Sequence, residues 1–239
     1  MSMLNLPEPY LLFLVGSGLF WSITYVLIIR RGHMDKAHGM PLWALALNFA
    51  WEFNYAFITP SPAPQLYVNI VWCLLDVVIL VHFLRYCRVD YPDLDVRKTY
   101  GLVALAFVVC WLAVVACQMD TWPLASPDYP LGMGRAYSAW GMNVSMSILF
   151  VYFIIGRKSV RGQSIYIAIA KWLGTVCAWF PFVLYCGLIP GMPVVPGTPE
   201  PTSWFFPLTY AATFVFDIIY ICQVYFQCKK EGINPWKRV

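Results

Sequence analysis

The chain has 239 residues, of which 60% are hydrophobic and 12% are charged, and its formal net charge is +4. A soluble domain of this length carries more charge, so this composition, with a mean hydropathy of +0.64, excludes an ordinary soluble enzyme and indicates a membrane protein. The eight cysteines and three histidines include no Cys-x-x-Cys pair, which argues against a zinc site or a disulfide framework.

Seven apolar runs follow one another along the chain, and each is roughly 18 to 25 residues long, enough to cross a hydrocarbon core of ~30 Å. They predict an all-α fold, a seven-transmembrane-helix bundle that occupies residues 1–239 as a single domain. No basic stretch with a cleavage site precedes the first run, so we expect no removable signal peptide. The predicted spans cover residues 10–29, 41–58, 66–84, 100–117, 136–155, 165–189 and 205–226.

Lysine and arginine residues are concentrated in alternate connections. Of the 16, 14 lie in the stretches 30–40, 85–98 and 156–164 and in the C-terminal tail; Arg135 lies on the other side and Lys171 lies inside the sixth span. Positively charged loops mark the cytosolic face of a membrane protein. The pattern therefore predicts a lumenal or external N-terminus and a cytosolic C-terminus. Because membrane topology explains the positive charge, we expect no nucleic-acid partner.

The second span, in the stretch NFAWEFNYAF, carries a carboxyl group at Glu52, and Asp76 and Asp217 lie near the middle of the third and seventh spans. An acidic side chain at the centre of a membrane helix costs about 3 kcal/mol on insertion scales, so each of these acids needs a reason to be there. We expect the long side chain of Lys171 to reach the headgroups from the sixth span. Pairing with one of the acids is the alternative.

Helical spacing places polar neighbours on the same faces as the acids. Because lipid cannot form hydrogen bonds, these faces are expected to point inward and to line a cavity open toward the outer half of the membrane. There, desolvation favours the neutral form of a carboxyl group, which can act as a general acid; interhelical hydrogen bonding is the alternative role. The polar stripes are Asn48, Glu52 and Tyr55; Asn69 and Asp76; Trp140, Asn143 and Ser147; and Tyr210, Thr213, Asp217 and Tyr220.

Aromatic residues form 18% of the chain, and five of them lie at the depth of the acids. Packing is the common role of such residues, but the face of an aromatic ring also stabilises a cation. A proton donor in an aromatic-lined apolar cavity would suit carbocation chemistry on a lipophilic substrate. The five residues are Trp51, Tyr55, Trp72, Trp140 and Tyr220.

Four stretches resemble the small integral-membrane terpene cyclases of fungal meroterpenoid and indole-diterpene pathways: GMPLWALALNFAWEFNYAFI, SAWG, KWLG and FVFDIIY. The resemblance covers nearly the whole chain, and the acid within AWEF is its most specific element. It implies a metal-independent cyclase, of the isomerase or intramolecular lyase type, that protonates the terminal epoxide or alkene of a prenylated polyketide or indole. It also implies a farnesyl or geranylgeranyl chain on the substrate, an epoxidase and a prenyltransferase earlier in the pathway, and a multi-pass location in a fungal endoplasmic reticulum membrane.

Carried over by position, the resemblance assigns catalytic roles to Glu52 and Asp217, either of which could be the direct proton donor. No cofactor or metal is implied, because the nearest stretch to an aspartate-rich magnesium motif, DYPDLD at 90–95, is interrupted by a proline and flanked by arginines. We interpret it as a solvated, ion-paired turn. The supporting pocket residues are Asp76, Asn48, Trp51, Tyr55, Trp72, Trp140, Asn143, Thr213 and Tyr220.

A seven-span, proton-coupled transporter of small solutes is the main alternative, because acids inside a membrane also mark proton pathways. Proline-glutamine-loop carriers place their Pro-Gln dipeptide within a span of a repeated three-helix unit, whereas Pro64-Gln65 lies in a predicted loop and no matching half is visible. A retinal protein needs a lysine deep in the last span, where this chain has Asp217. The cyclase therefore explains more of the pattern than either alternative.

Overall fold

The computed structural model describes residues 8–92, 95–121, 133–185, 190–191 and 204–239. These residues form seven α-helices, a π-helical turn and a short 3-10 helix, and contain no strand, so the all-α prediction is confirmed. The helices are α1 (Glu8–Asp35), α2 (Leu42–Phe53), α3 (Gln65–Asp90), α4 (Val96–Thr121), α5 (Gly134–Arg157), α6 (Ile165–Tyr185) and α7 (Phe205–Lys230).

Six of the described helices, all except α2, are long and apolar enough to cross a membrane. The last four residues of the predicted span 165–189 lie outside the described residues. The helix α2 has only 12 residues, a rise of about 18 Å, and continues into a π-helical turn at Asn54–Ile58. The second predicted span is therefore not one regular helix of membrane length.

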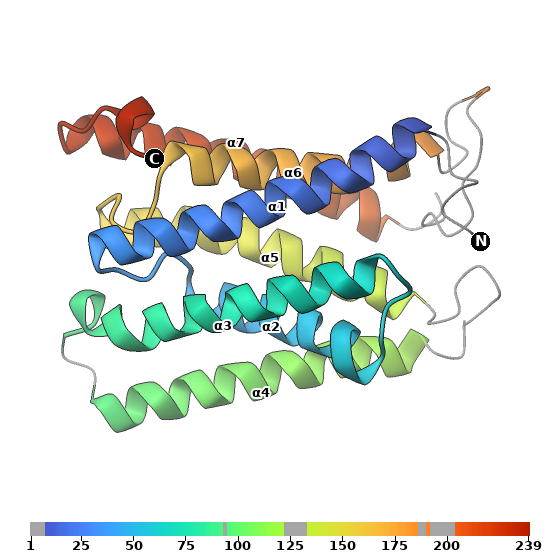
Figure 1. Cartoon of the computed structure of the whole chain (residues 1–239), viewed down its shortest axis with the longest axis horizontal. Helices are drawn as coiled ribbons and strands as arrows, with labels where there is room; N and C mark the ends of the chain where they lie inside the picture. Colours follow the sequence, from blue (N-terminus) through green and yellow to red (C-terminus); the bar gives the residue numbers. More distant parts are fainter. Residues whose placement is uncertain (1–7, 93–94, 122–132, 186–189, 192–203) are drawn as a thin grey trace.

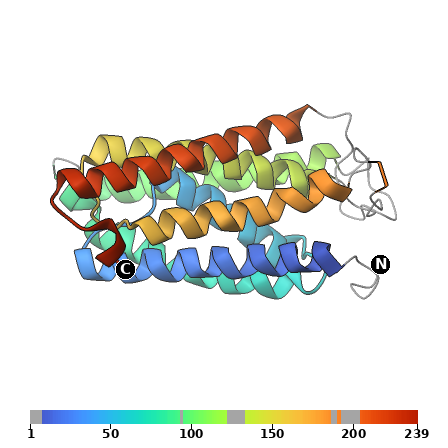
Figure 2. The ribbon, with the colours of Figure 1, turned by 90° about the horizontal axis from the view of Figure 1, so that it is seen from above.

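The helices run side by side along the long axis of the molecule (Figures 1 and 2). The first helix, α1, packs against α3 and α6, and α7 packs against α5 and α6. The short helix α2 contacts α3, α4 and α5, and most of its residues are buried. This arrangement places the helix that carries Glu52 inside the bundle.

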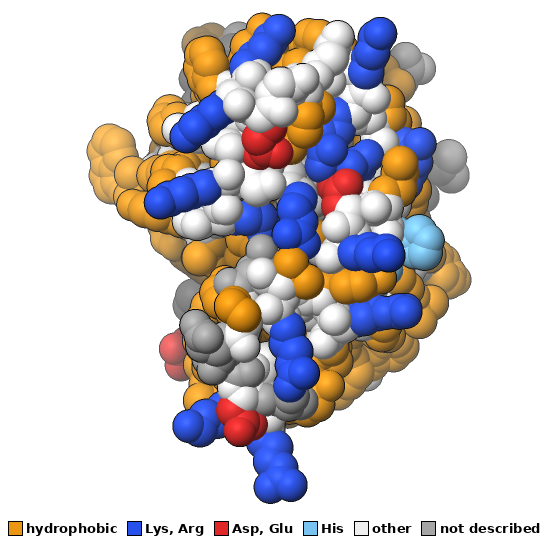
Figure 3. Space-filling model, turned by 90° about the vertical axis from the view of Figure 1, so that its left-hand side faces the viewer, with side chains coloured by type: hydrophobic (Ala, Val, Ile, Leu, Met, Phe, Trp, Pro, Cys, Tyr) orange, Lys and Arg blue, Asp and Glu red, His pale blue; other side chains and the backbone are white. Residues whose placement is uncertain are grey.

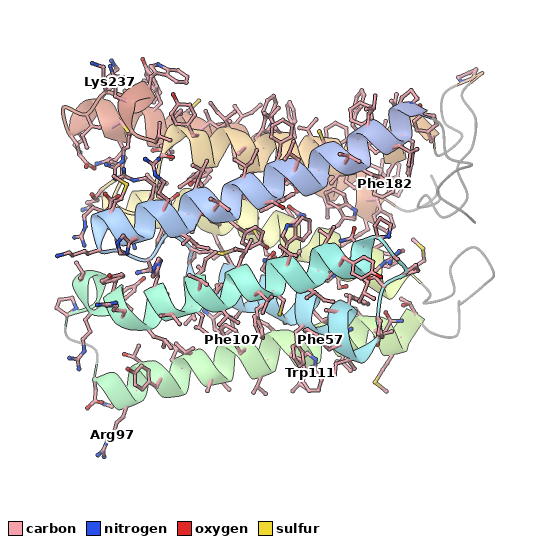
Figure 4. All side chains as sticks on the ribbon, viewed as in Figure 1. Phe57, Arg97, Phe107, Trp111, Phe182 and Lys237 are labelled. Atoms are coloured by element: carbon pink, nitrogen blue, oxygen red, sulfur yellow. The ribbon has the colours of Figure 1, made fainter. Side chains whose placement is uncertain are left out.

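Lysine and arginine side chains gather at one end of the bundle, where α1, α3, α5 and α7 end and α4 and α6 begin (Figure 3). Arg97, near the start of α4, and Lys237, after α7, both lie at this end, whereas Phe182 lies toward the other (Figure 4). The alternate loops that carry the positive charge are thus brought together on one face, which we call the basic end.

The C-terminal tail is tied to the basic end through Asp35 at the end of α1. The carboxyl group of Asp35 accepts a hydrogen bond from the backbone N–H of Gly162 at 2.7 Å and pairs with the guanidinium of Arg238 at 2.5 Å. Arg238 also donates to the backbone oxygen of Gln163 at 2.9 Å. These contacts join the tail, the α5–α6 connection and α1, so this end of the bundle is held by charged hydrogen bonds.

His38, in the connection between α1 and α2, is 1% exposed and lies against Arg157. The guanidinium of Arg157 donates to the backbone oxygen of His38 at 2.9 Å and lies 3.1 Å from its Nε2 atom. Burial, followed by the charges of Arg157 and Arg161, lowers the pKa of His38 from 6.5 to about 3. The imidazole is therefore held neutral in the folded protein.

Stability should depend on pH through His38. In the unfolded chain His38 binds a proton near pH 6.5, whereas in the folded chain it does so only near pH 3. Its contribution to the free energy of unfolding is therefore complete above about pH 6.5 and is lost as the pH falls toward 3. Between about pH 7 and 5 we expect the melting temperature in detergent to fall more for the wild type than for His38→Gln. His33→Gln, which changes an exposed histidine of α1, is the matched control and should behave as the wild type. Equal slopes in the wild type and His38→Gln would contradict this assignment.

Candidate active site

The first polar cluster lies where α1, α2 and α3 meet. Asn48 and Glu52 are one turn apart on α2, Tyr25 comes from α1, and Asp76 comes from α3. Glu52 is 1% exposed and Asp76 is fully buried. The amide of Asn48 joins the two acids, because its Nδ2 atom lies 2.9 Å from Glu52 Oε1 and 2.9 Å from Asp76 Oδ2.

Tyr25 completes this cluster. Its hydroxyl group donates to Glu52 Oε1 and contacts Asn48 Nδ2. Three oxygens surround Asn48 Nδ2, from Tyr25, Glu52 and Asp76, but this nitrogen carries only two hydrogens. The hydroxyl hydrogen of Tyr25 supplies the further hydrogen bond, to Glu52. No donor among the described residues reaches Glu52 Oε2 or Asp76 Oδ1. A proton carried by either acid therefore belongs on its second oxygen.

The Glu52–Asp76 pair favours a state in which one proton is retained. Both carboxyl groups lie in the interior and share a single amide donor. Burial and mutual repulsion both disfavour a second negative charge at such a pair. Two carboxyl groups that share a proton are a common arrangement for acid catalysis. The cluster can thus hold a transferable proton away from water.

A second polar cluster joins α5, α6 and α7. The Nζ atom of Lys171 lies 2.5 Å from Asp217 Oδ1 and 2.8 Å from Ser147 Oγ, and Lys171 and Asp217 are both fully buried. The expectation that Lys171 reaches the headgroups is therefore wrong, and the alternative of a partnership with an acid is confirmed. The reason is that Asp217 occupies the facing position on α7, where a paired opposite charge offsets the cost of burying the ammonium.

Aromatic rings of α1 lie between the two clusters. The ring of Trp21 lies 5.7 Å from Lys171 Nζ and 6.3 Å from the ring of Tyr25, one turn further along the helix. Gly174, one turn after Lys171, makes room for this ring, because a Cβ atom there would lie 2.8 Å from Trp21 Cδ1. Glu52 and Asp217 thus belong to two clusters that share an aromatic wall, and each has its own hydrogen-bond partners.

Tyr55 lies in the π-helical turn that follows α2, and its side chain is fully buried. The amide of Asn69 donates to the backbone oxygen of Tyr55 at 3.2 Å and supports the turn. The hydroxyl of Tyr55 donates to Gln118 on α4 at 2.8 Å. The predicted contact between Asn48 and Glu52 is confirmed; Tyr55 is buried as well, but its hydroxyl bonds Gln118 and not the first cluster.

Two predicted tryptophans of the second and third spans lie at different distances from the acids. Trp72 is beside the first cluster: its ring stacks on Tyr25 with centroids 6.1 Å apart, and its Nε1 donates to Ser22 at 3.0 Å. The Nε1 group of Trp51 instead donates to the backbone oxygen of Arg135 at 3.2 Å. Trp72 therefore has the closer contact with the candidate proton donors.

The remaining predicted residues of α5 and α7 are buried along the interior. Asn143 lies one turn before Ser147 and is 3.5 Å from Thr175, while the hydroxyl of Thr213 donates to the backbone of its own helix at 2.6 Å. Trp140 of α5 packs against the ring of Tyr210 on α7, and Tyr220, one turn after Asp217, donates to Gln163. The expectation that these polar side chains face inward is confirmed.

Residues of α1 are the part of the site that sequence reasoning missed. Tyr25 and Trp21 contact the two clusters directly, yet the first span has no charged residue in its middle to draw attention to them. Their spacing of four residues, which places them on one helical face, was the available signal.

The described residues include no group of three or more histidine, cysteine, aspartate or glutamate side chains that could hold a metal ion. Within the DYPDLD stretch, Asp93 lies outside the described residues. Asp95 accepts a hydrogen bond from the backbone N–H of Arg97 at 2.7 Å at the start of α4. Asp95 therefore stabilises the start of α4 through this hydrogen bond.

Comparisons with known proteins agree with this architecture. The family of Pyr4-like transmembrane terpene cyclases matches residues 8–231. The Pyr4-family terpene cyclase mfmH of Annulohypoxylon moriforme is 28% identical over 90% of this chain and 89% of its own length. The terpene cyclase macJ of Penicillium terrestre is 29% identical over 73% of this chain and 69% of its own length. The terpene cyclase idtB of Claviceps paspali is 29% identical over 74% of this chain and 70% of its own length.

The chain belongs to the family of Pyr4-like transmembrane terpene cyclases. The family resemblance noted in the sequence is thereby confirmed, and the six apolar helices agree with a multi-pass membrane protein. No solved structure matches the chain.

Proposed function

We propose that this protein is a membrane terpene cyclase that protonates the terminal epoxide, or a terminal alkene, of a prenylated polyketide or indole. The observation that carries the proposal is the buried Glu52–Asp76 pair, whose carboxyl groups share the amide of Asn48 and each keep one oxygen without a donor. Such a pair retains a proton in a dry interior and can deliver it to a lipophilic guest.

The proposed reaction is an isomerisation that begins with Glu52. A proton moves from Glu52 Oε2 to the epoxide oxygen, the C–O bond to the more substituted carbon breaks, and the double bonds of the chain add in turn to the cation. Loss of a proton from carbon ends the sequence, so no atom is gained or lost. Exchange with water after product release returns the proton to Glu52. Tyr25 and Asn48 hold its Oε1 atom, Asp76 shares the amide of Asn48 with it, and Asp217 is the second catalytic carboxyl group.

For the membrane arrangement we propose that α2 and its π-helical turn together complete a seventh crossing. The basic end then faces the cytosol with the C-terminus, α1 begins on the lumenal or external side, and the membrane is that of the endoplasmic reticulum. Support comes from the gathering of lysine and arginine side chains at that end (Figure 3).

The proposed substrate carries a farnesyl or geranylgeranyl chain. Its lipophilic chain suits aromatic side chains at the depth of the acids, such as Trp72 and Trp21. A terminal epoxide has to be made before this step, and the chain has to be attached to its head group, so an epoxidase and a prenyltransferase would act earlier.

Microsomes that contain the protein test this proposal. Incubated with epoxidised farnesyl and geranylgeranyl derivatives of aromatic polyketides and indoles, they should convert at least one into a cyclic isomer of unchanged mass. Detergent-solubilised protein should do the same, which a transporter would not because no membrane separates two compartments. Failure with every candidate, in microsomes that demonstrably contain the folded protein, would refute the proposed function.

Chelation of metals should leave the reaction unaffected, because the proposed proton source is a pair of carboxyl groups. We expect the conversion rate after treatment with EDTA to equal that of untreated membranes within about twofold. Membranes treated with EDTA and then supplied with Mg²⁺ serve as the control. A clear loss of activity that Mg²⁺ restores would contradict this prediction and would indicate that the aspartates of residues 90–95 bind a metal.

A further inference from the structure

The ion pair between Lys171 and Asp217 has an asymmetry that bears on catalysis. Asp217 Oδ1 accepts from the ammonium at 2.5 Å, but no donor among the described residues reaches Asp217 Oδ2. Both side chains of the pair are fully buried. One oxygen of this carboxylate is therefore fixed and the other is bare.

The surroundings hold Lys171 in one position. Its ammonium donates to Ser147 at 2.8 Å, and the rings of Trp21 and Phe150 each lie 5.7 Å from Nζ. Aromatic faces stabilise a cation, and the carboxylate neutralises it. A lysine held in this way fixes Oδ1 of Asp217 and so sets the orientation of its carboxyl group.

We infer that Lys171 is a positioning residue that holds Asp217 as the base which ends the cyclisation. This inference rests on the proposed function and divides the work between the two clusters. The Glu52–Asp76 pair gives a proton to the substrate oxygen. At the end, a C–H bond next to the final cation breaks, its electron pair forms a C=C bond, and the proton goes to Asp217 Oδ2. Exchange with water after product release restores both carboxyl groups.

The geometry of α1 supports this division. Trp21 contacts the ammonium of Lys171, and Tyr25, which bonds Glu52, lies beside Trp21 with ring centroids 6.3 Å apart. An extended polyene that lay along this face of α1 would have the acid near one end and the base near the other.

Kinetics of purified protein in nanodiscs test the role of Lys171. The probe is an epoxidised farnesyl aryl compound that the wild type cyclises, with and without deuterium at the carbon that loses the final proton. For Lys171→Met we expect kcat to fall about 10²-fold, KM to stay within about twofold, and alcohols formed by capture of the cation by water to increase. The isotope effect on kcat should rise because the final proton loss becomes slow. Lys171→Arg keeps the positive charge and should restore the product ratio in part.

Ser145→Ala is the matched control, since Ser145 lies near Ser147 on α5 but its hydroxyl donates only to the backbone oxygen of Gly141 on its own helix. This variant should retain the wild-type kinetics. The inference is overturned if Lys171→Met keeps its kcat within about threefold, or if kcat falls only in proportion to the amount of folded protein with an unchanged product ratio and isotope effect. If the wild type cyclises none of the candidates, the proposed function fails instead, and this inference fails with it.

Discussion

Glu52→Gln should reduce cyclisation by about 10²–10⁴-fold, because it removes the proton that the reaction needs while keeping the size of the side chain. The amide can still accept a hydrogen bond from Tyr25 at its oxygen, so the cluster loses its acid without losing its packing. The measurement is the rate of product formation per folded protein in membranes, with folding judged by the melting temperature in detergent.

Two further variants sharpen that result. Asp120→Asn changes an exposed acid near the end of α4 and should leave the rate unchanged. Asp76→Asn should lower the rate about tenfold to 100-fold, since it removes the residue that shares the proton with Glu52 but not the donor itself. Near-normal turnover of Glu52→Gln would refute the assignment of the proton donor.

Asp217→Asn should affect both activity and stability. The substitution leaves the ammonium of Lys171 buried and without its carboxylate, and removal of one partner of a buried ion pair costs about 3–5 kcal/mol. We therefore expect a lower melting temperature together with a nearly complete loss of cyclisation. The loss of stability and the loss of activity can be separated, because only the loss of stability comes from the unpaired ammonium of Lys171.

The double variant Lys171→Met/Asp217→Asn separates them. It removes both charges, so we expect it to regain most of the stability that Asp217→Asn loses and none of the activity. Ser145→Ala again provides the reference for an unrelated polar change in α5. If the double variant recovers activity together with stability, Asp217 has a structural role only.

Much of the fold follows from patterns that local physics controls. The apolar runs predict seven spans, and six of these form helices of membrane length; all six except α6 extend beyond a predicted end. The exception is the second span, where the chain after Phe53 forms a π-helical turn. Its support by the side chain of Asn69, from another helix, depends on tertiary contact.

The sequence predicts which residues belong to the candidate site, but not which residues of different helices contact one another. Spacing along a helix places Asn48 beside Glu52, and the structure confirms that contact. Which helices face one another decides the rest: Asp76 meets Glu52, and Lys171 meets Asp217. No period within a single span contains that information, so spacing alone does not decide between the headgroups and an acid as the partner of Lys171.

Trp21 and Tyr25 have one more consequence for how the molecule keeps its chemistry ready. Glu52 and Asp217 have opposite roles in the proposed mechanism, so the proton of Glu52 must not pass to Asp217 before the substrate binds. The indole of Trp21, admitted close to α6 by Gly174, lies between the tyrosine that bonds Glu52 and the ammonium that bonds Asp217. In the proposed mechanism this ring would keep the proton donor and the base apart within one apolar interior.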